Sequence, residues 1–182
     1  MLLALAILAF VALERLIEVL ISLRNTRNLL AAGAVEHGAN HYPVIVALHA
    51  AWFAAMILFL PKPVEIHWPW IVLFAGLQVL RVWTMASMGH WFSTRVVTIA
   101  DAPLVTRGPY RFMRHPNYAI VVGEIACLPL AFGETGVAIL FSALNAVMLA
   151  WRIRVEDGAL APRREQAAGQ TGTDTPQTRY HP

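Results

Sequence analysis

The chain has 182 residues, of which 58% are hydrophobic and 14% are charged, whereas soluble domains are about 45–50% apolar and about 25% charged. This apolar surplus indicates that part of the surface faces lipid, and it argues against a soluble nucleotide-binding enzyme of the Rossmann type. The formal net charge of +3 would also suit nucleic-acid binding, so the basic residues must first be placed along the chain. The one cysteine, Cys127, excludes an intramolecular disulfide framework and a zinc site built from several cysteines.

Five apolar segments follow one another, and each is predicted to form a membrane-spanning helix. A helix needs about 20 mostly apolar residues to cross a bilayer, and fewer where flanking residues reach the interface. The segments are residues 1–23, 44–60, 68–88, 117–132 and 137–152. The first lacks a basic leading segment and a small-residue cleavage site, so we expect a retained helix rather than a signal peptide. The sequence therefore predicts an all-α integral membrane protein, a bundle of about five transmembrane helices.

The composition changes after residue 161. Residues 162–182 are polar and rich in Gly, Pro, Thr and Gln, so they bury too little apolar surface to order themselves. We predict a single transmembrane domain over residues 1–161 and a disordered cytoplasmic tail over residues 162–182.

The basic residues predict the orientation of the helices. With five spans, eleven of the fourteen lysine and arginine residues lie on one side of the membrane, in segments 24–42 and 89–116 and after residue 151. Cytoplasmic loops retain Lys and Arg, so we expect the N-terminus outside and the C-terminus in the cytoplasm. Because this topology accounts for the basic surplus, no nucleic-acid partner is expected.

The fourth and fifth segments are joined only by residues 133–136, which begin and end with glycine. So short a connection predicts an antiparallel helical hairpin. The two segments are of similar length, so residues 107–118 and 152–157 should meet at the same cytoplasmic level. Most of the charge near any predicted membrane boundary lies in these two stretches.

The chemistry of these stretches suits a zwitterionic ligand that also carries a cation. Pro116 fits the first turn of a helix, whose N-terminus attracts anions. Tyr110 and Tyr118 offer ring faces to a cation, and Arg152 and Glu156 share a helix face. S-adenosylmethionine is such a ligand, with Glu156 as an acceptor for its ribose diol. The alternative is that these side chains are interfacial anchors and an ordinary surface ion pair.

The sequence Arg107-Gly-Pro-Tyr-Arg-Phe-Met-Arg-His-Pro-Asn-Tyr118, followed by Arg152-Ile-Arg-Val-Glu-Asp-Gly-Ala-Leu160, resembles the isoprenylcysteine carboxyl methyltransferase family of integral membrane enzymes. The resemblance covers residues 89–161 well. The stretches 14–18 (Glu-Arg-Leu-Ile-Glu) and 41–43 (His-Tyr-Pro) are similar to the bacterial branch found beside type III polyketide synthases. Members of that branch O-methylate alkylpyrones or alkylresorcinols, so the resemblance implies a bacterial inner-membrane enzyme and a polyketide synthase as a pathway neighbour.

The resemblance also implies a cytoplasmic pocket for S-adenosylmethionine and assigns residues to it. The cofactor-binding positions fall on Leu104, Val105, Tyr110, His115, Pro116, Asn117, Tyr118 and Glu156. The arginine that faces the acceptor falls on Arg152. The chain departs from the prenylcysteine enzymes at Asp157, where they usually have glutamate, and it lacks their aromatic-rich C-terminal segment.

An acidic residue within the fourth segment allows two interpretations. Glu124 is either a general base for a phenol or enol acceptor or the ion-pair partner of Arg81 or Arg15. The charged stretch 14–18 is expected to form an internal structural network. No metal site is expected, because His37 and His41 lack an obvious third ligand.

The leading hypothesis is a methyltransferase that passes a methyl group from S-adenosylmethionine to an oxygen of a lipid-like acceptor from the bilayer. The acceptor oxygen belongs to a carboxylate, a phenol or an enol, as in an isoprenylcysteine, an alkylresorcinol or an alkylpyrone. The alternatives are a phospholipid N-methyltransferase, or a small membrane transport or scaffold protein that uses the hairpin only for assembly.

Overall fold

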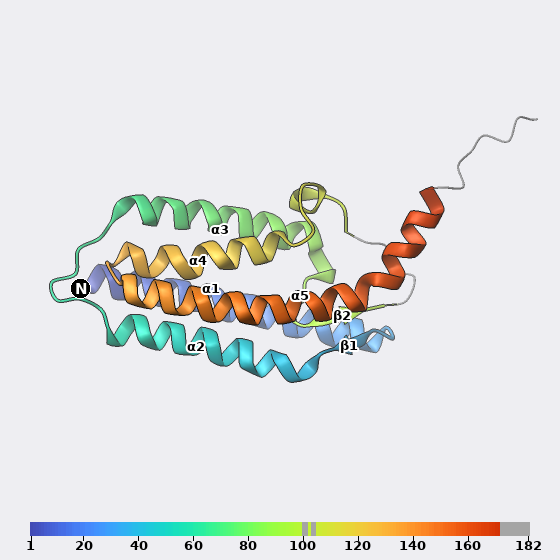
Figure 1. Cartoon of the computed structure of the whole chain (residues 1–182), viewed down its shortest axis with the longest axis horizontal. Helices are drawn as coiled ribbons and strands as arrows, with labels where there is room; N and C mark the ends of the chain where they lie inside the picture. The colour runs from blue at the N-terminus through green and yellow to red at the C-terminus, as the bar shows by residue number, and fades with distance from the viewer. Residues whose placement is uncertain (100–101, 103–104, 172–182) are drawn as a thin grey trace, which may run out of the picture.

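The computed structural model describes residues 1–99, 102 and 105–171, and it confirms the all-α class (Figure 1). All five predicted segments lie in helices. These are α1 (Leu2–Ala31), α2 (Tyr42–Leu58), α3 (Trp68–Met88), α4 (Pro116–Ala131) and α5 (Thr135–Thr171). They run side by side along the long axis of the molecule. The helical backbone of α5 continues beyond residue 161, where the sequence predicted the end of the domain.

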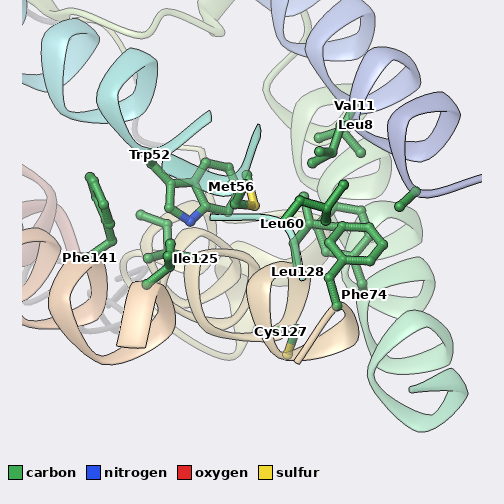
Figure 2. Close-up of a cluster of buried hydrophobic side chains, with 13 residues drawn as sticks. Leu8, Val11, Trp52, Met56, Leu60, Phe74, Ile125, Cys127, Leu128 and Phe141 are labelled. Carbon is green, nitrogen blue, oxygen red and sulfur yellow. The ribbon is translucent and has the colours of Figure 1, made fainter. Parts of the chain in front are cut away.

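The bundle is held together by apolar side chains drawn from all five helices (Figure 2). Leu8 of α1, Met56 of α2, Phe74 of α3, Leu128 of α4 and Phe141 of α5 belong to one buried cluster. Close packing of such side chains in a shared core fixes the spacing of the helices.

The outer faces of the helices are apolar as well. Val72 and Val79 of α3 and Val147 of α5 are 69%, 72% and 74% exposed. Helices that are hydrophobic all round belong to a large core or to a membrane. Two helical segments are long and apolar enough to cross a membrane, Trp68–Trp91 and Thr135–Ala161, while Tyr42–Leu58 and Pro116–Ala131 are shorter apolar helices. Crossing of the bilayer by all five helices stays a prediction.

The hairpin of α4 and α5 is present as the sequence predicted (Figure 1). The backbone N–H groups of Phe132, Gly133 and Glu134 donate to carbonyls of the last turn of α4. Gly133 has a φ of +78°, a conformation that glycine adopts without strain and that reverses the chain at this point. The part of α5 near residue 152 is thereby returned to the start of α4.

Two short strands form a ribbon that the sequence did not predict. β1 (Val35–His37) pairs antiparallel with β2 (Val96–Thr98), with Val35 opposite Thr98. The ribbon lies at the end of the bundle where α4 begins (Figure 1). It joins the loop between α1 and α2 to the loop between α3 and α4, close to α5.

Candidate functional site

A cavity of about 440 Å³ lies at the end of the bundle that carries the ribbon. Polar side chains from the loop before α4, the first turn of α4, and α5 line it. They include Tyr110, Arg114, His115, Asn117, Tyr118, Arg152 and Glu156. Apolar side chains from the end of α3, β2 and α5 complete the wall. They include Met88, Trp91, Phe92, Val96, Val97 and Leu160.

Most of the predicted site residues therefore surround one cavity, Val105 among them. Pro116 is buried at the start of α4, and its position in the first turn was predicted from its lack of a backbone N–H. His115 occupies the N-cap position, without a side-chain hydrogen bond to the helix. Leu104 lies outside the described residues. Glu124 is not among the described residues that line the cavity.

Tyr118 is the centre of the hydrogen bonds in this cavity. Its hydroxyl donates to Glu156 and accepts a hydrogen bond of 2.7 Å from Nε of Arg152. Nη2 of Arg152 also donates to the backbone carbonyl of Thr94, at 2.6 Å. These bonds hold α4, α5 and the loop before β2 in one arrangement, so the guanidinium and the carboxylate have fixed positions.

His115 faces the acidic end of α5. Its Nδ1 lies 3.5 Å from a carboxylate oxygen of Glu156, and its Nε2 lies 3.4 Å from Asp157. Its ring stacks on Tyr118, with centroids 5.2 Å apart. Hydrogen bonding to Glu156, opposed by burial, raises the pKa of His115. The same carboxylate accepts a hydrogen bond from the Tyr118 hydroxyl. Contact with Glu156 therefore favours the protonated form of the His115 imidazole.

The turn before α4 packs closely against the end of α3. Gly108 has a φ of +61°, and a Cβ atom there would lie 1.9 Å from Oγ of Ser87. Nε of Arg107 donates to the Ser87 carbonyl at 2.8 Å, and the Tyr110 hydroxyl donates to the sulfur of Met88. Burial, and then the Glu156 carboxylate, raise the pKa of Tyr110, so its phenol stays neutral. Glycine is required here by both conformation and space.

Glu124 lies in a buried cluster of charged and polar side chains between the helices. It accepts hydrogen bonds of 2.8 Å from Nε of Arg81 and from Gln78, and Nη2 of Arg81 contacts its other oxygen. Arg15 lies 3.5 Å from the same carboxylate. Both partners that the sequence offered for Glu124 are therefore in contact with it. A role as general base stays a prediction.

The acidic residues of α1 meet this cluster. Glu18 lies 3.1 Å from Arg15 and 3.2 Å from Arg81, and Arg15 also donates to Gln78. One carboxylate oxygen of Glu14 is buried without a hydrogen-bond partner in the described part of the chain. The stretch 14–18 thus supplies an ion-pair network, as the sequence predicted, with Glu14 at its edge.

The polar end of α1 holds the loop 89–94, a feature that sequence reasoning missed. Ser22 contacts the hydroxyl of Thr94 at 2.8 Å and accepts from its backbone N–H at 2.7 Å. Thr26 contacts Ser93, and Asn25 donates to the Phe92 carbonyl. The spacing i, i+3, i+4 of these α1 residues was the available signal, since it places three small polar side chains on one helix face.

Arg95, which directly precedes β2, is held in place by an ion pair and an aromatic ring. Nη1 of Arg95 pairs with both oxygens of Glu36, at 2.9 and 3.1 Å, and its guanidinium lies 4.6 Å from the centre of the Tyr42 ring. Arg95 also lines the cavity, as do Trp91 and Phe92. The segment before β2 thus contributes Trp91, Phe92, Ser93 and Arg95 to the cavity wall.

The fold and the cavity together define a helical protein with an apolar exterior and a partly polar cavity at one end. Comparison with known proteins identifies its family. The model of the isoprenylcysteine carboxyl methyltransferase family matches residues 70–162, just over half of the chain. The chain is 35% identical over 158 residues to a Bacillus subtilis (strain 168) protein named "Uncharacterized protein YpbQ", covering 85% of this chain and 94% of that protein. No solved structure matches.

The chain therefore belongs to the isoprenylcysteine carboxyl methyltransferase family. This membership, with the apolar helices, makes the protein a membrane methyltransferase. The methyltransferases of the family generally use S-adenosylmethionine.

Proposed function

We propose that the protein transfers a methyl group from S-adenosylmethionine to an oxygen of a lipid-like acceptor, such as an alkylpyrone, an alkylresorcinol or an isoprenylcysteine. One observation carries the proposal: the hairpin brings the motif residues His115 and Tyr118 into contact with Arg152 and Glu156 around one cavity.

The cavity suits the cofactor in size and in chemistry. Small-molecule sites measure about 300–1,000 Å³ and are mostly apolar with a few placed polar groups. The carboxylate of Glu156 suits the ribose hydroxyls or the ammonium group of the cofactor, and Arg114 suits its carboxylate. The tyrosine rings of Tyr110 and Tyr118 suit the sulfonium cation. Leu104, Val105, Pro116 and Asn117 complete the proposed set.

S-adenosylmethionine supplies an electrophilic methyl group attached to a sulfonium, which is a good leaving group. The protein's own contribution is then mainly positioning. Arg152 has its guanidinium fixed by Tyr118 and Thr94, so it can orient an acceptor carboxylate or favour the ionised form of a phenol or enol. A carboxylate acceptor needs no general base, whereas a neutral phenol must lose its proton.

The apolar part of the cavity wall supports a lipid-like acceptor. Met88, Trp91, Phe92 and Val96 give this part of the cavity an apolar surface. A bilayer around the apolar helices is the natural source of such an acceptor. We place the protein in the bacterial inner membrane, with the N-terminus outside and the site in the cytoplasm. We propose a type III polyketide synthase as its pathway neighbour.

The first test is binding of S-adenosylhomocysteine to the purified full-length chain in detergent, measured by calorimetry. We expect binding by the wild type and its loss in Glu156→Ala and His115→Ala. Glu65→Ala is the matched control, because Glu65 is an exposed acidic residue in the loop between α2 and α3, at the opposite end of the bundle. Failure of the wild type to bind would refute the cofactor assignment.

The second test identifies the acceptor. The protein is incubated with labelled S-adenosylmethionine and, separately, an alkylpyrone, an alkylresorcinol, an isoprenylcysteine and phosphatidylethanolamine. Label in one of the three oxygen acceptors supports the proposal. Label in the amine lipid alone would refute O-methylation and point to a phospholipid N-methyltransferase.

A further inference from the structure

We propose that Arg81 and Glu124 are positioning residues for the cofactor pocket, and that they act through Asn117 in the first turn of α4. The inference rests on the proposed function, because it concerns the same cavity. It assigns Glu124 a role that requires no contact with substrate or cofactor.

Arg81 joins three helices from a buried position. Its side chain is 6% exposed, and its guanidinium contacts Glu124 of α4 through two nitrogens and Glu18 of α1 through a third. A planar guanidinium between two carboxylates has one favoured orientation, unlike the flexible ammonium of lysine. The ion pairs therefore fix the direction in which Arg81 points.

The same guanidinium also contacts a residue that lines the cavity. Nη1 of Arg81, which contacts Glu18, also lies 3.5 Å from the side-chain oxygen of Asn117. Asn117 lines the cavity and stands between Pro116, the first residue of α4, and Tyr118. Arg81 is thus a direct physical link between the buried charges and the residues proposed to hold the cofactor.

The first turn of α4 is the part of the site most sensitive to this link. His115, Asn117 and Tyr118 share that turn, so a small rotation or shift of it moves all three side chains together. Removing Arg81 would leave Glu124 and Glu18 buried with one fewer cation, which forces the helices to rearrange or the carboxylates to take up protons. Misplacement of reacting groups by about 1 Å can reduce rates about 100-fold.

The test compares two arginines of the same cluster. Arg81→Met and Arg15→Met each remove one buried guanidinium and leave a side chain of similar length. Arg15 contacts Glu18, Gln78 and Glu124, whereas Arg81 alone of the two contacts Asn117. Both variants should lower the midpoint of thermal unfolding. Only Arg81→Met should also raise the dissociation constant for S-adenosylhomocysteine, by about 10- to 100-fold.

A double-mutant cycle isolates the link. In an Asn117→Ala background, Arg81→Met should raise the dissociation constant by much less than it does in the wild type, because the contact is already lost. An equal effect in both backgrounds would overturn the inference. If Arg81→Met does not fold, Arg81→Lys replaces it in the cycle, since lysine keeps the charge and loses the fork that reaches Asn117.

Glu124→Gln separates positioning from general-base catalysis. If Glu124 is a positioning residue, the substitution should raise the dissociation constant for S-adenosylhomocysteine and leave the pH profile of kcat unchanged. If Glu124 is a general base, the substitution should lower kcat, flatten the acid limb of its pH profile and leave cofactor affinity unchanged. The second pattern would overturn the inference. If the wild type binds S-adenosylhomocysteine but the cycle shows no coupling between Arg81 and Asn117, only this inference is refuted. If the wild type does not bind it, the proposed function is refuted as well.

Discussion

Replacing Tyr118 with phenylalanine removes one hydroxyl and keeps the ring that stacks on His115. The hydroxyl makes two bonds, one donated to Glu156 and one accepted from Arg152. The variant therefore tests whether the contact between α4 and α5 organises the site, with little change in packing.

The expected cost follows from the partners that remain. Hydrogen bonds to charged groups contribute about 1.5–3 kcal/mol each to stability. Arg152 keeps its bond of 2.6 Å to the Thr94 carbonyl, and Glu156 keeps His115 at 3.5 Å, so neither charge is left alone. We expect the free energy of unfolding to fall by about 1.5–3 kcal/mol, the value of one such bond rather than two. The carboxylate and guanidinium then lose their fixed orientation, which should raise the dissociation constant for S-adenosylhomocysteine about 10- to 100-fold.

The assay pairs thermal unfolding with calorimetric binding in the same detergent. Tyr42→Phe is the control, because it removes a hydroxyl that contacts the neutral Thr94 side chain at 3.1 Å, and Tyr42 is not among the described residues that line the cavity. It should cost about 0.5–1.5 kcal/mol and leave cofactor affinity nearly unchanged. Wild-type affinity in Tyr118→Phe would refute the view that this hydroxyl organises the site.

Three further changes have distinct expected outcomes. Gly108→Ala places a Cβ atom 1.9 Å from Oγ of Ser87 in a backbone with φ of +61°, so thermal unfolding should show a loss of more than about 1 kcal/mol, and a change within error would contradict the steric argument. Ser22→Ala removes both contacts to Thr94 and should cost about 1–3 kcal/mol, the sum of two neutral hydrogen bonds, with a negligible cost contradicting that estimate. For His115→Gln, the pH dependence is the test. The raised pKa of His115 means that its pair with Glu156 stabilises the fold below the ordinary histidine value of 6.5 and is lost as pH rises through the raised pKa. The stability difference between wild type and variant should therefore shrink as pH rises from 6.5 through the raised pKa of His115, and a difference that does not vary with pH would rule out the charged pair.

The sequence was most informative where the determinants are local. Continuous apolar runs predicted the five helices, and the glycines at 133 and 136 predicted the hairpin. The hairpin in turn predicted that the stretches 107–118 and 152–157 would meet, because helices of similar length return the chain to the same level, and Tyr118 and Glu156 are in contact there. These inferences need only the periods of regular structure and the conformational freedom of glycine.

The features that were missed depend on which segments meet, and local pattern does not specify that. The strand pair Val35–His37 and Val96–Thr98 is too short for an alternating pattern, and its partners are far apart in the chain. The bond from Arg152 to the Thr94 carbonyl involves a backbone group, which carries no side-chain signal. For Glu124 the sequence offered Arg81 and Arg15 as alternatives, and the structure brings both to it because α1 and α3 both pack beside α4.

The first turn of α4 contacts both the cavity residues and the buried charged cluster. From the cavity side, Arg152 and Glu156 hold Tyr118, and from inside the bundle Arg81 contacts Asn117. Pro116, at the first helical position, restricts the backbone immediately before these two residues. The scarce charges of this apolar chain therefore lie where they orient one helical turn from two directions. Because that turn carries the side chains proposed to hold the cofactor, changes in the buried cluster should alter binding without touching the ligand.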